Sequence, residues 1–201
     1  MLTTRSLWGA ATGLAVILIL AGSGWAGPLD EPGFIKQLNC SACHGANGNS
    51  RSDSMPILAG TDAAYFKKQI EAYAAAKRPS PEMEPYAKQV LLLGVDDVAR
   101  YFASQKMEPT PVKAPADAVQ RGKAASTQCV LCHGQDGKGD RAKLIPSLVG
   151  QPPGYLKEQM LLFKQDKRNP GDATLKALKA LMATIPDDTY ADLAAYYSSL
   201  R

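Results

Sequence analysis

Cysteine and histidine are rare in this chain, and they occur only together. The 201 residues include four cysteines and two histidines, and all of them stand in two copies of the pattern Cys-x-x-Cys-His. The copies run from Cys40 to His44 and from Cys129 to His133. A Cys-x-x-Cys pair can form a redox disulfide, half of a zinc site, or the covalent attachment point of a haem. The rest of the sequence decides among these three chemistries.

Haem attachment fits better than the alternatives. A zinc site needs four ligands, whereas one motif supplies three and two motifs on one zinc would leave two over. A thioredoxin-like pair needs a preceding strand, and no strand pattern is present. Structural disulfides suit an oxidising compartment, but they do not explain a histidine directly after each pair. We therefore expect two covalently bound haems c, each with an iron. The expected attachment residues are Cys40, Cys43, Cys129 and Cys132, and the expected iron-binding histidines are His44 and His133.

No histidine is left for the opposite face of either iron, so methionine is the expected second ligand. In the first half, Met83 follows a Lys-Arg-Pro loop and precedes the last helix. Met55 is the competitor, but it lies too near His44 in sequence to cross easily to the other face, and most methionines serve in packing. We predict that Met83 binds the first iron.

The second half has no methionine at the corresponding position. When the final helices are aligned on their tyrosines, Leu178 falls opposite Met83. Met182 lies one helical turn further on, and a longer preceding loop allows a changed register. We predict that Met182 binds the second iron. The alternatives are a five-coordinate iron or an unusual donor such as Lys179.

A proline follows each histidine by 12 or 13 residues, and these prolines are Pro56 and Pro146. A ligating imidazole usually donates its other N–H to a carbonyl, which fixes the orientation of the ring. We expect the two proline loops to present that carbonyl and so to belong to the cofactor-binding sites. A simple turn is the alternative.

The elements that must position these residues are themselves repeated. Downstream of each motif, the pattern Pro-x-Leu-x-Gly-x-x-x-x-Tyr-x-x-x-Gln recurs with identical spacing, followed by a Lys-Arg pair and by a closing segment, DVARYFAS or DLAAYYSS. Repetition at this many fixed positions indicates a duplication. Three prolines between the copies favour an extended, semi-rigid linker. We therefore expect a first domain at 27–107, a linker at 108–116 and a second domain at 117–201.

The apolar pattern is helical, because side chains recur at spacings of three and four. The two clearest stretches are Tyr65, Phe66, Gln69, Ile70 and Tyr73, and Val95, Val98, Ala99 and Phe102. No alternating run is long enough for a strand, so the expected fold class is all-α. A domain of roughly 80 to 90 residues is near the lower limit for a fold held by its core alone. We expect haem to fill each centre, and neither half to fold stably without it.

The first 26 residues have the features of a secretory signal peptide. Arg5 is followed by an apolar run from Leu7 to Ala21, and the small residues Gly24 and Ala26 then stand three and one places before a plausible cut after Ala26. The run is too short and too rich in glycine for a membrane span, although an uncleaved anchor is the alternative. We predict export across the inner membrane into a bacterial periplasm.

Charge differs between the two halves. Residues 27–107 carry nine basic and nine acidic side chains, whereas residues 108–201 carry thirteen and ten, a net charge of +3. About four ionised haem propionates would bring the holoprotein near neutrality. The chain has no concentrated basic stripe of the kind that binds nucleic acid. Its lysines are expected to steer a partner with acidic groups, or to be ordinary solvated surface.

These motifs resemble the dihaem cytochrome c4 family over nearly all of the mature chain. The resemblance rests on the two Cys-x-x-Cys-His-Gly-x-x-Gly motifs, the repeated proline-to-glutamine segments, the Lys-Arg loops and the closing helices. It implies two class I cytochrome c domains related by a pseudo-twofold axis, with the haem edges near each other at the domain interface. It also implies His/Met ligation, by His44 with Met83 and by His133 with Met182. Leu178 departs from the family's methionine position.

The resemblance implies an electron carrier and not an enzyme. The family transfers electrons in the periplasm from a cytochrome bc complex or a dehydrogenase to a terminal oxidase, and membrane association is expected only through partners or an uncleaved anchor. One alternative is an electron-accepting subunit, as in flavocytochrome c sulfide dehydrogenase, which would show a large apolar surface patch. Another is a haem enzyme with an open second iron. The sequence offers no free cysteine, distal histidine or obviously placed acid–base residue for such chemistry.

Overall fold

The computed structural model describes residues 28–31, 33–168 and 173–201. Within these ranges the regular structure is helical, apart from an isolated β-bridge between Asp140 and Ile145, so the predicted all-α fold is confirmed. No helix in this part of the chain is long and apolar enough to cross a membrane. The predicted signal segment, 1–26, lies outside the described residues. The α-helices are α1 (Phe34–His44), α2 (Ala63–Ala74), α3 (Met83–Leu93), α4 (Val95–Ser104), α5 (Ala116–Ala125), α6 (Val130–His133), α7 (Pro153–Lys164), α8 (Ala173–Ala183) and α9 (Thr189–Ser199).

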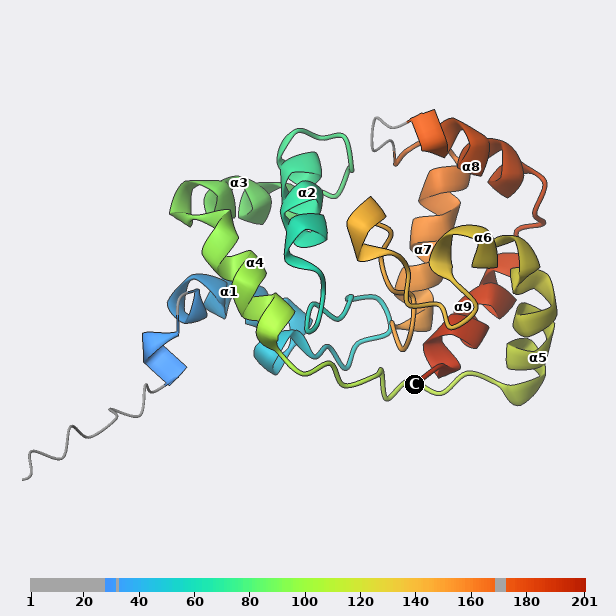
Figure 1. Cartoon of the computed structure of the whole chain (residues 1–201), viewed down its shortest axis with the longest axis horizontal. Coiled ribbons are helices and arrows are strands. Elements are labelled where there is room, and N and C mark those ends of the chain that lie inside the picture. Colours follow the sequence, from blue (N-terminus) through green and yellow to red (C-terminus); the bar gives the residue numbers. More distant parts are fainter. Residues whose placement is uncertain (1–27, 32, 169–172) are drawn as a thin grey trace, which may run out of the picture.

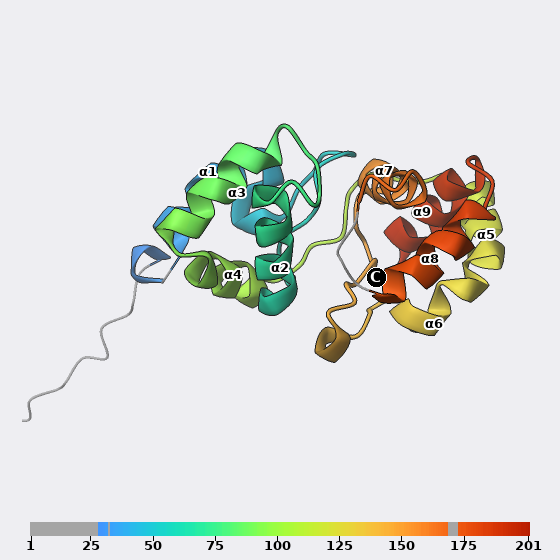
Figure 2. The same cartoon turned by 90° about the horizontal axis from the view of Figure 1, so that it is seen from above.

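The helices form two bundles that lie side by side along the long axis of the molecule (Figure 1). The first bundle contains α1 to α4, and the second contains α5 to α9. Helix α2 of the first bundle faces α7 of the second, and the view from above shows the same arrangement (Figure 2). Side chains of the helix that follows the proline loop in each copy therefore take part in the contact between the bundles.

The first bundle has one contiguous apolar core. The predicted apolar face of α4 is buried, from Val95 to Phe102. It packs against α2, whose Phe66 and Ile70 are buried in the same core. By contrast, Gln69 of the same predicted stretch does not face this core. Its side chain accepts hydrogen bonds at the contact with the second bundle, because the helix has a second partner there.

Among the residues whose side chains the structure describes, the core of the second bundle is divided into two smaller clusters. One consists of Leu156, Ala194 and Tyr197, and the other of Met182, Tyr190 and Leu193. Two half-buried side chains, Cys129 and Met160, pack against both clusters. The first cysteine of the second motif thus joins the two parts of this core.

A glycine lets the first and last long helices of each bundle approach closely. Gly122 lies within α5, and a Cβ atom at this position would be 1.9 Å from the backbone oxygen of Asp192 in α9. Gly33 holds the corresponding place directly before α1, where a Cβ atom would be 2.4 Å from the backbone oxygen of Asp97 in α4. Both glycines stand seven residues before the first cysteine of their motif. A side chain at either position would push the two helices apart.

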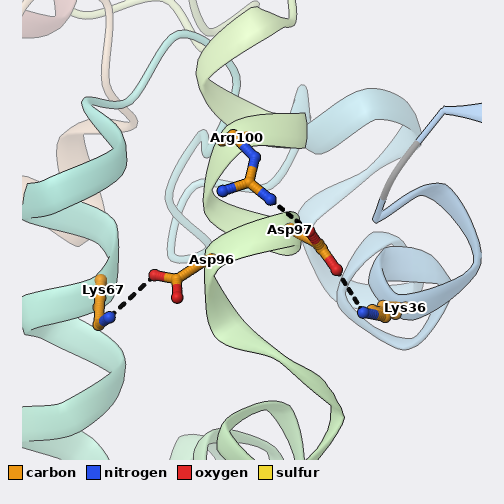
Figure 3. Close-up of polar contacts among 5 residues, drawn as sticks. All are labelled: Lys36, Lys67, Asp96, Asp97 and Arg100. Carbon is orange, nitrogen blue, oxygen red and sulfur yellow. Dashed lines mark hydrogen bonds and ion pairs between the residues drawn. The ribbon is translucent and has the colours of Figure 1, made fainter.

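Ion pairs also stabilise the contacts between these helices, α1 with α4 and α5 with α9. In the first bundle, Asp97 of α4 pairs with Lys36 of α1 and with Arg100 of its own helix (Figure 3). In the second bundle, the carboxylate of Asp192 accepts hydrogen bonds from Nε and Nη2 of Arg121 in α5, at 2.7 and 2.8 Å. The aspartate that each glycine approaches is therefore also the acceptor that joins the two helices.

We expect Gly122→Ala to lower the free energy of unfolding of the second bundle by about 1–3 kcal/mol, which is the usual range for inserting a group into a packed contact. The loss should appear although alanine favours an isolated helix over glycine by about 1 kcal/mol. Denaturant unfolding of the holoprotein measures the change. Gln120→Ala, on the exposed side of the same helix, is the control and should cause no loss. An unchanged midpoint for Gly122→Ala would contradict the close crossing.

The duplication seen in the sequence recurs in the backbone hydrogen bonds. In each copy, the residue two places after the loop proline donates its N–H to a glycine that follows the motif. The glycine of the same loop donates its N–H to the last helix. These bonds are Leu58 N to Gly48 O (2.8 Å) and Leu148 N to Gly137 O (2.9 Å), and Gly60 N to Phe102 O (2.8 Å) and Gly150 N to Tyr197 O (3.0 Å). Each bundle therefore holds its proline loop in the same way.

The proline-rich segment between α4 and α5 is attached to both bundles. The backbone N–H of Glu108 donates to Oδ1 of Asn49 in the first bundle at 2.8 Å. The buried Thr110 donates its N–H to the carbonyl of Gly150 in the second bundle at 2.8 Å. The segment contains no helix or strand, and these bonds at both of its sides restrict its motion.

Candidate haem sites

Each motif histidine is bound to its proline loop. Nδ1 of His44 lies 2.9 Å from the carbonyl oxygen of Pro56, and Nδ1 of His133 lies 3.0 Å from that of Pro146. Both hydrogen bonds predicted from the proline spacing are therefore present. Because a carbonyl only accepts, Nδ1 carries the proton in each ring and Nε2 keeps its lone pair. Helices α1 and α6 end at these histidines, and a glycine with positive φ turns the chain after each of them.

The imidazole of His44 has one unsatisfied atom. The side chain is only 5 % exposed, and its Nε2 is buried without a hydrogen-bond partner in the part of the chain that the structure describes. Burial lowers the pKa of His44, and the hydrogen bond to Pro56 opposes this effect without reversing it. The pKa of His133 is lowered for the same reason. Both rings are therefore neutral at neutral pH, as an iron ligand must be.

None of the four cysteines is paired in a disulfide. Cys40 and Cys129 are half-buried against the cores, whereas Cys43 and Cys132 are exposed. Burial raises the pKa of Cys40 to about 11, so this thiol is neutral. Among the described residues, no three His, Cys, Asp or Glu side chains gather as they would around a metal ion held by such side chains alone. Two thiols next to an imidazole with an unpartnered Nε2 fit a covalently attached haem.

The two methionines that compete for the first iron lie in different surroundings. Met83 is the first residue of α3 and, like Cys40, packs against the core of the first bundle. Met55 directly precedes Pro56, whose carbonyl binds Nδ1 of His44. Because Nδ1 and Nε2 lie on different edges of the imidazole, the loop bound to Nδ1 would be on the edge turned away from an iron held by Nε2. This geometry favours Met83 over Met55.

Replacing Met83 by alanine should lower the reduction potential of one haem, because the thioether that stabilises the reduced iron is lost. The same change should open that iron to added cyanide or carbon monoxide. The other haem should be unaffected. Spectroelectrochemical titration and ligand-binding spectra of the holoprotein measure both effects. Met55→Ala is the matched control and should keep both potentials. If Met55→Ala opens the iron instead, Met83 is not the ligand.

In the second bundle, Met182 is 5 % exposed near the end of α8. It belongs to the cluster against which Cys129 packs, as Met83 and Cys40 pack against the core of the first bundle. When the last helices are aligned, however, Met182 takes the place of Ala87, a fully buried core residue. Its burial is therefore compatible both with iron binding and with packing.

The two other side chains considered for this iron are also placed by the structure. Leu178, at the position that corresponds to Met83, is half-buried and packs against the same cluster as Met182. The amine of Lys179 forms an ion pair with Asp166. An amine held by a carboxylate is less available to an iron, which leaves Met182 as the better donor of the two.

The sequence did not predict that several repeated polar residues meet between the bundles. They are Tyr65, Gln69 and Arg78 in the first bundle, and Tyr155, Gln159 and Arg168 in the second. The sequence features that could have indicated these residues are the identical spacing of Tyr and Gln in both copies and the Lys-Arg pair in each loop. The first proline loop reaches the same contact, because N–H and C=O of Ile57 both bind the side-chain amide of Gln151 at 2.9 Å.

Two helical bundles, each with a Cys-x-x-Cys-His motif and a carbonyl-bound imidazole, define a c-type cytochrome with two haems. The family model for cytochrome c matches residues 119–201. Cytochrome c4 of Pseudomonas aeruginosa is 32% identical over 195 residues, which cover 94% of this chain and 96% of that protein. The chain belongs to the cytochrome c4 family. The family's members are electron carriers, and this chain carries two covalently bound haems c.

Two further comparisons extend this result. The crystal structure of reduced cytochrome c4 from Pseudomonas stutzeri superimposes with a TM-score of 0.74 at 26% sequence identity, and the match covers 83% of this chain and 95% of that one. A thiosulfate dehydrogenase electron acceptor of Stutzerimonas stutzeri is 30% identical over 180 residues, which cover 80% of this chain and 78% of that protein. The class I cytochrome c fold expected from the resemblance is thus confirmed.

Proposed function

We propose that this chain is a periplasmic electron carrier that accepts electrons from a cytochrome bc complex or a dehydrogenase and delivers them to a terminal oxidase. The observation that supports it is the buried imidazole of His44, whose Nδ1 is bound to the Pro56 carbonyl while Nε2 has no partner among the described residues. Bound haem supplies an iron that takes up and releases one electron. A ring fixed in this way holds its ligand position in both oxidation states.

The proposal assigns a role to each site residue. The cysteine pairs attach the haems, and the proline carbonyls orient the imidazoles. A protein ligand on both faces of each iron leaves no open position for a substrate, which suits a carrier better than an enzyme. The proposed ligand pairs are His44 with Met83 and His133 with Met182, within domains at 27–107 and 117–201 joined by the linker at 108–116.

Rapid mixing of the purified holoprotein tests this function. The oxidised protein should be reduced by a bc complex supplied with quinol, and the reduced protein should be oxidised by membranes that contain a terminal oxidase. Both reactions should slow at high salt if charged surfaces steer the encounter. A holoprotein that neither membrane complex reduces or oxidises would contradict the proposed role.

A dehydrogenase-bound electron acceptor is the second candidate function. It is favoured by the exposed large apolar side chains of the first bundle, which lie on the 3₁₀-helix η1 (Pro28–Asp30), on α1 and on α3. They are Leu29, Ile35, Leu38, Tyr86, Leu91, Leu92 and Leu93. Helix α1 contacts both other elements, and exposed apolar surface of this kind marks protein interfaces. A relative named for accepting electrons from thiosulfate dehydrogenase points in the same direction.

The second candidate is distinguished by its dependence on this surface. Leu92, which is 89 % exposed, can be replaced by glutamine without disturbing a core. If a dehydrogenase is the donor, Leu92→Gln should slow reduction by the dehydrogenase and leave oxidation by the oxidase unchanged. Equal rates for the variant and the natural protein with a thiosulfate-oxidising dehydrogenase would remove this candidate.

A further inference from the structure

The last helices of the two bundles hold equivalent buried rings that differ in one hydroxyl group. Tyr197 of α9 is 3 % exposed, and its counterpart in α4 is Phe102, which is fully buried. The backbone carbonyls of both residues accept the N–H of the loop glycine, Gly150 or Gly60. The two rings therefore start from the same place in the fold, and the second bundle has a phenol where the first has a plain ring.

The glycine eight residues after the first cysteine of each motif lies against this ring. A Cβ atom at Gly137 would be 3.2 Å from two ring carbons of Tyr197, and one at Gly48 would be 2.8 and 2.9 Å from two ring carbons of Phe102. The ring of Tyr196 also packs against that of Tyr197, with the centroids 5.0 Å apart. These contacts restrict the ring of Tyr197 and thereby fix the place of its hydroxyl.

The hydroxyl of Tyr197 is buried and has no hydrogen-bond partner among the described residues. Burial raises the pKa of this phenol, and the neighbouring Cys129 thiol raises it further, so the phenol keeps its proton. Ser126 is a second polar neighbour, and it donates its own hydroxyl proton to the carbonyl of Lys123 at 2.8 Å. A buried donor without an acceptor costs free energy. The phenol proton therefore needs an acceptor on the side of Cys129 and Ser126.

The sulfur of Cys129 can be that acceptor. Cys129 packs against the cluster that contains Tyr197. Burial raises the pKa of the Cys129 thiol, and the phenol of Tyr197 opposes this effect, as a proton donor beside the sulfur does. A thiol can donate or accept, but the thioether formed on haem attachment has no proton and can only accept. In the holoprotein, the phenol is therefore the donor of this pair.

We propose that the hydroxyl of Tyr197 donates a hydrogen bond to the thioether sulfur of Cys129 and thereby raises the reduction potential of the second haem. In this bond the positive end of the O–H dipole points at the sulfur. Because oxidised iron carries one more positive charge, a positive end on this side disfavours the oxidised state. Hydrogen bonds around a haem are one of the means by which a protein sets its potential.

The proposal makes the two haems unequal, because Phe102 has no hydroxyl to offer the first haem. It requires a haem attached at Cys129, but it requires none of the redox partners proposed above. The proposed function and this inference can therefore fail separately.

Tyr197→Phe in the holoprotein tests the proposal, and Phe102 shows that the fold accepts a phenylalanine at this place. In a spectroelectrochemical titration, one of the two potentials should fall and the other should stay unchanged. Loss of one neutral hydrogen bond should shift the equilibrium about two- to tenfold toward oxidised iron. A tenfold shift is about 59 mV for a one-electron couple. Tyr196→Phe removes a hydroxyl from the adjacent half-buried ring, and as the matched control it should leave both potentials unchanged.

Denaturant unfolding of the same variants separates a hydrogen bond from packing. If the hydroxyl donates to the sulfur, Tyr197→Phe should shift the unfolding equilibrium up to about tenfold toward the unfolded state. A hydroxyl that stays without an acceptor in the holoprotein would give the opposite result, because its removal would stabilise the fold. If Tyr197→Phe keeps the potentials of the natural protein, Tyr197 is only a packing residue and the proposal is wrong.

The oxygen of Ser126 is the other neighbouring acceptor, and Ser126→Ala distinguishes it from the sulfur. This variant should keep both potentials. It should also keep the slowly exchanging phenol proton of Tyr197 in the nuclear magnetic resonance spectrum of the reduced holoprotein, whereas Tyr197→Phe should lose it. A potential that falls as far in Ser126→Ala as in Tyr197→Phe would assign the hydrogen bond to Ser126 and overturn the role of the sulfur.

Discussion

Replacing both Cys40 and Cys43 by alanine should give a protein that carries half the haem and has an unfolded N-terminal half. The physical reason is size, because a bundle of four short helices buries too little apolar surface to be stable without a filled centre. In the structure, Cys40 packs against the only buried cluster described for the first bundle, and the imidazole of His44 keeps an unpartnered buried nitrogen. Without the haem, that nitrogen would have no partner and the core would have no centre.

Haem content per chain, helical circular dichroism and limited proteolysis measure this result. The symmetric variant, with Cys129 and Cys132 replaced by alanine, is the matched control and should unfold the second half instead. Its effect should be at least as large, because the core of the second bundle is divided and Cys129 contacts both parts. A first bundle that stays helical and resistant to protease without haem would contradict the role of haem as its core.

Met182→Ala should convert the second haem from low to high spin and lower its reduction potential. The thioether of a methionine stabilises the reduced iron, and its loss leaves an open position. Met182 is buried in the cluster that Cys129 contacts, and the phenol of Tyr190 donates a hydrogen bond to its backbone carbonyl at 2.6 Å. This bond fixes the backbone at the residue whose sulfur is expected to reach the iron.

Leu178→Ala is the control for Met182→Ala, because Leu178 holds the position that corresponds to Met83 and packs against the same cluster. It should only open a cavity, which costs about 2–4 kcal/mol of domain stability, with the spin state unchanged. Spin state is read from the oxidised spectra, and stability from denaturant unfolding. If the natural protein already has a high-spin second haem that binds small ligands, Met182 is not a ligand, and an enzyme becomes the better account of that domain.

The haem chemistry could be read from the sequence because it depends on short spacings. Two Cys-x-x-Cys-His motifs use every cysteine and histidine of the chain, and the proline 12 or 13 residues later reaches Nδ1 in both copies. The helical class followed from apolar spacing in the same way, and the buried face of α4 has the expected residues. Signals of this kind are local, and the fold does not need to be known to interpret them.

The remaining features depend on where the two bundles and their helices lie. Gln69 was read as part of an apolar stretch, yet it binds both interface arginines, because the position of the second bundle cannot be inferred from helical spacing. Gly33 and Gly122 were not singled out, since a close helix crossing leaves no local signal except the absent side chain. Arg78 appeared only as a repeated basic residue. Its burial and its neutral partners become visible only in three dimensions.

The central claim is that two haems with His/Met ligation make this chain an electron carrier. The weak long-wavelength absorption band of sulfur-bound ferric haem tests this claim most directly. The band should be measured per haem in the oxidised natural protein and in the single and double alanine variants of Met83 and Met182. The account predicts that each single variant loses half of the band and that the double variant loses all of it. A band that disappears completely in Met83→Ala alone would show that the second iron has no methionine ligand and would contradict the account.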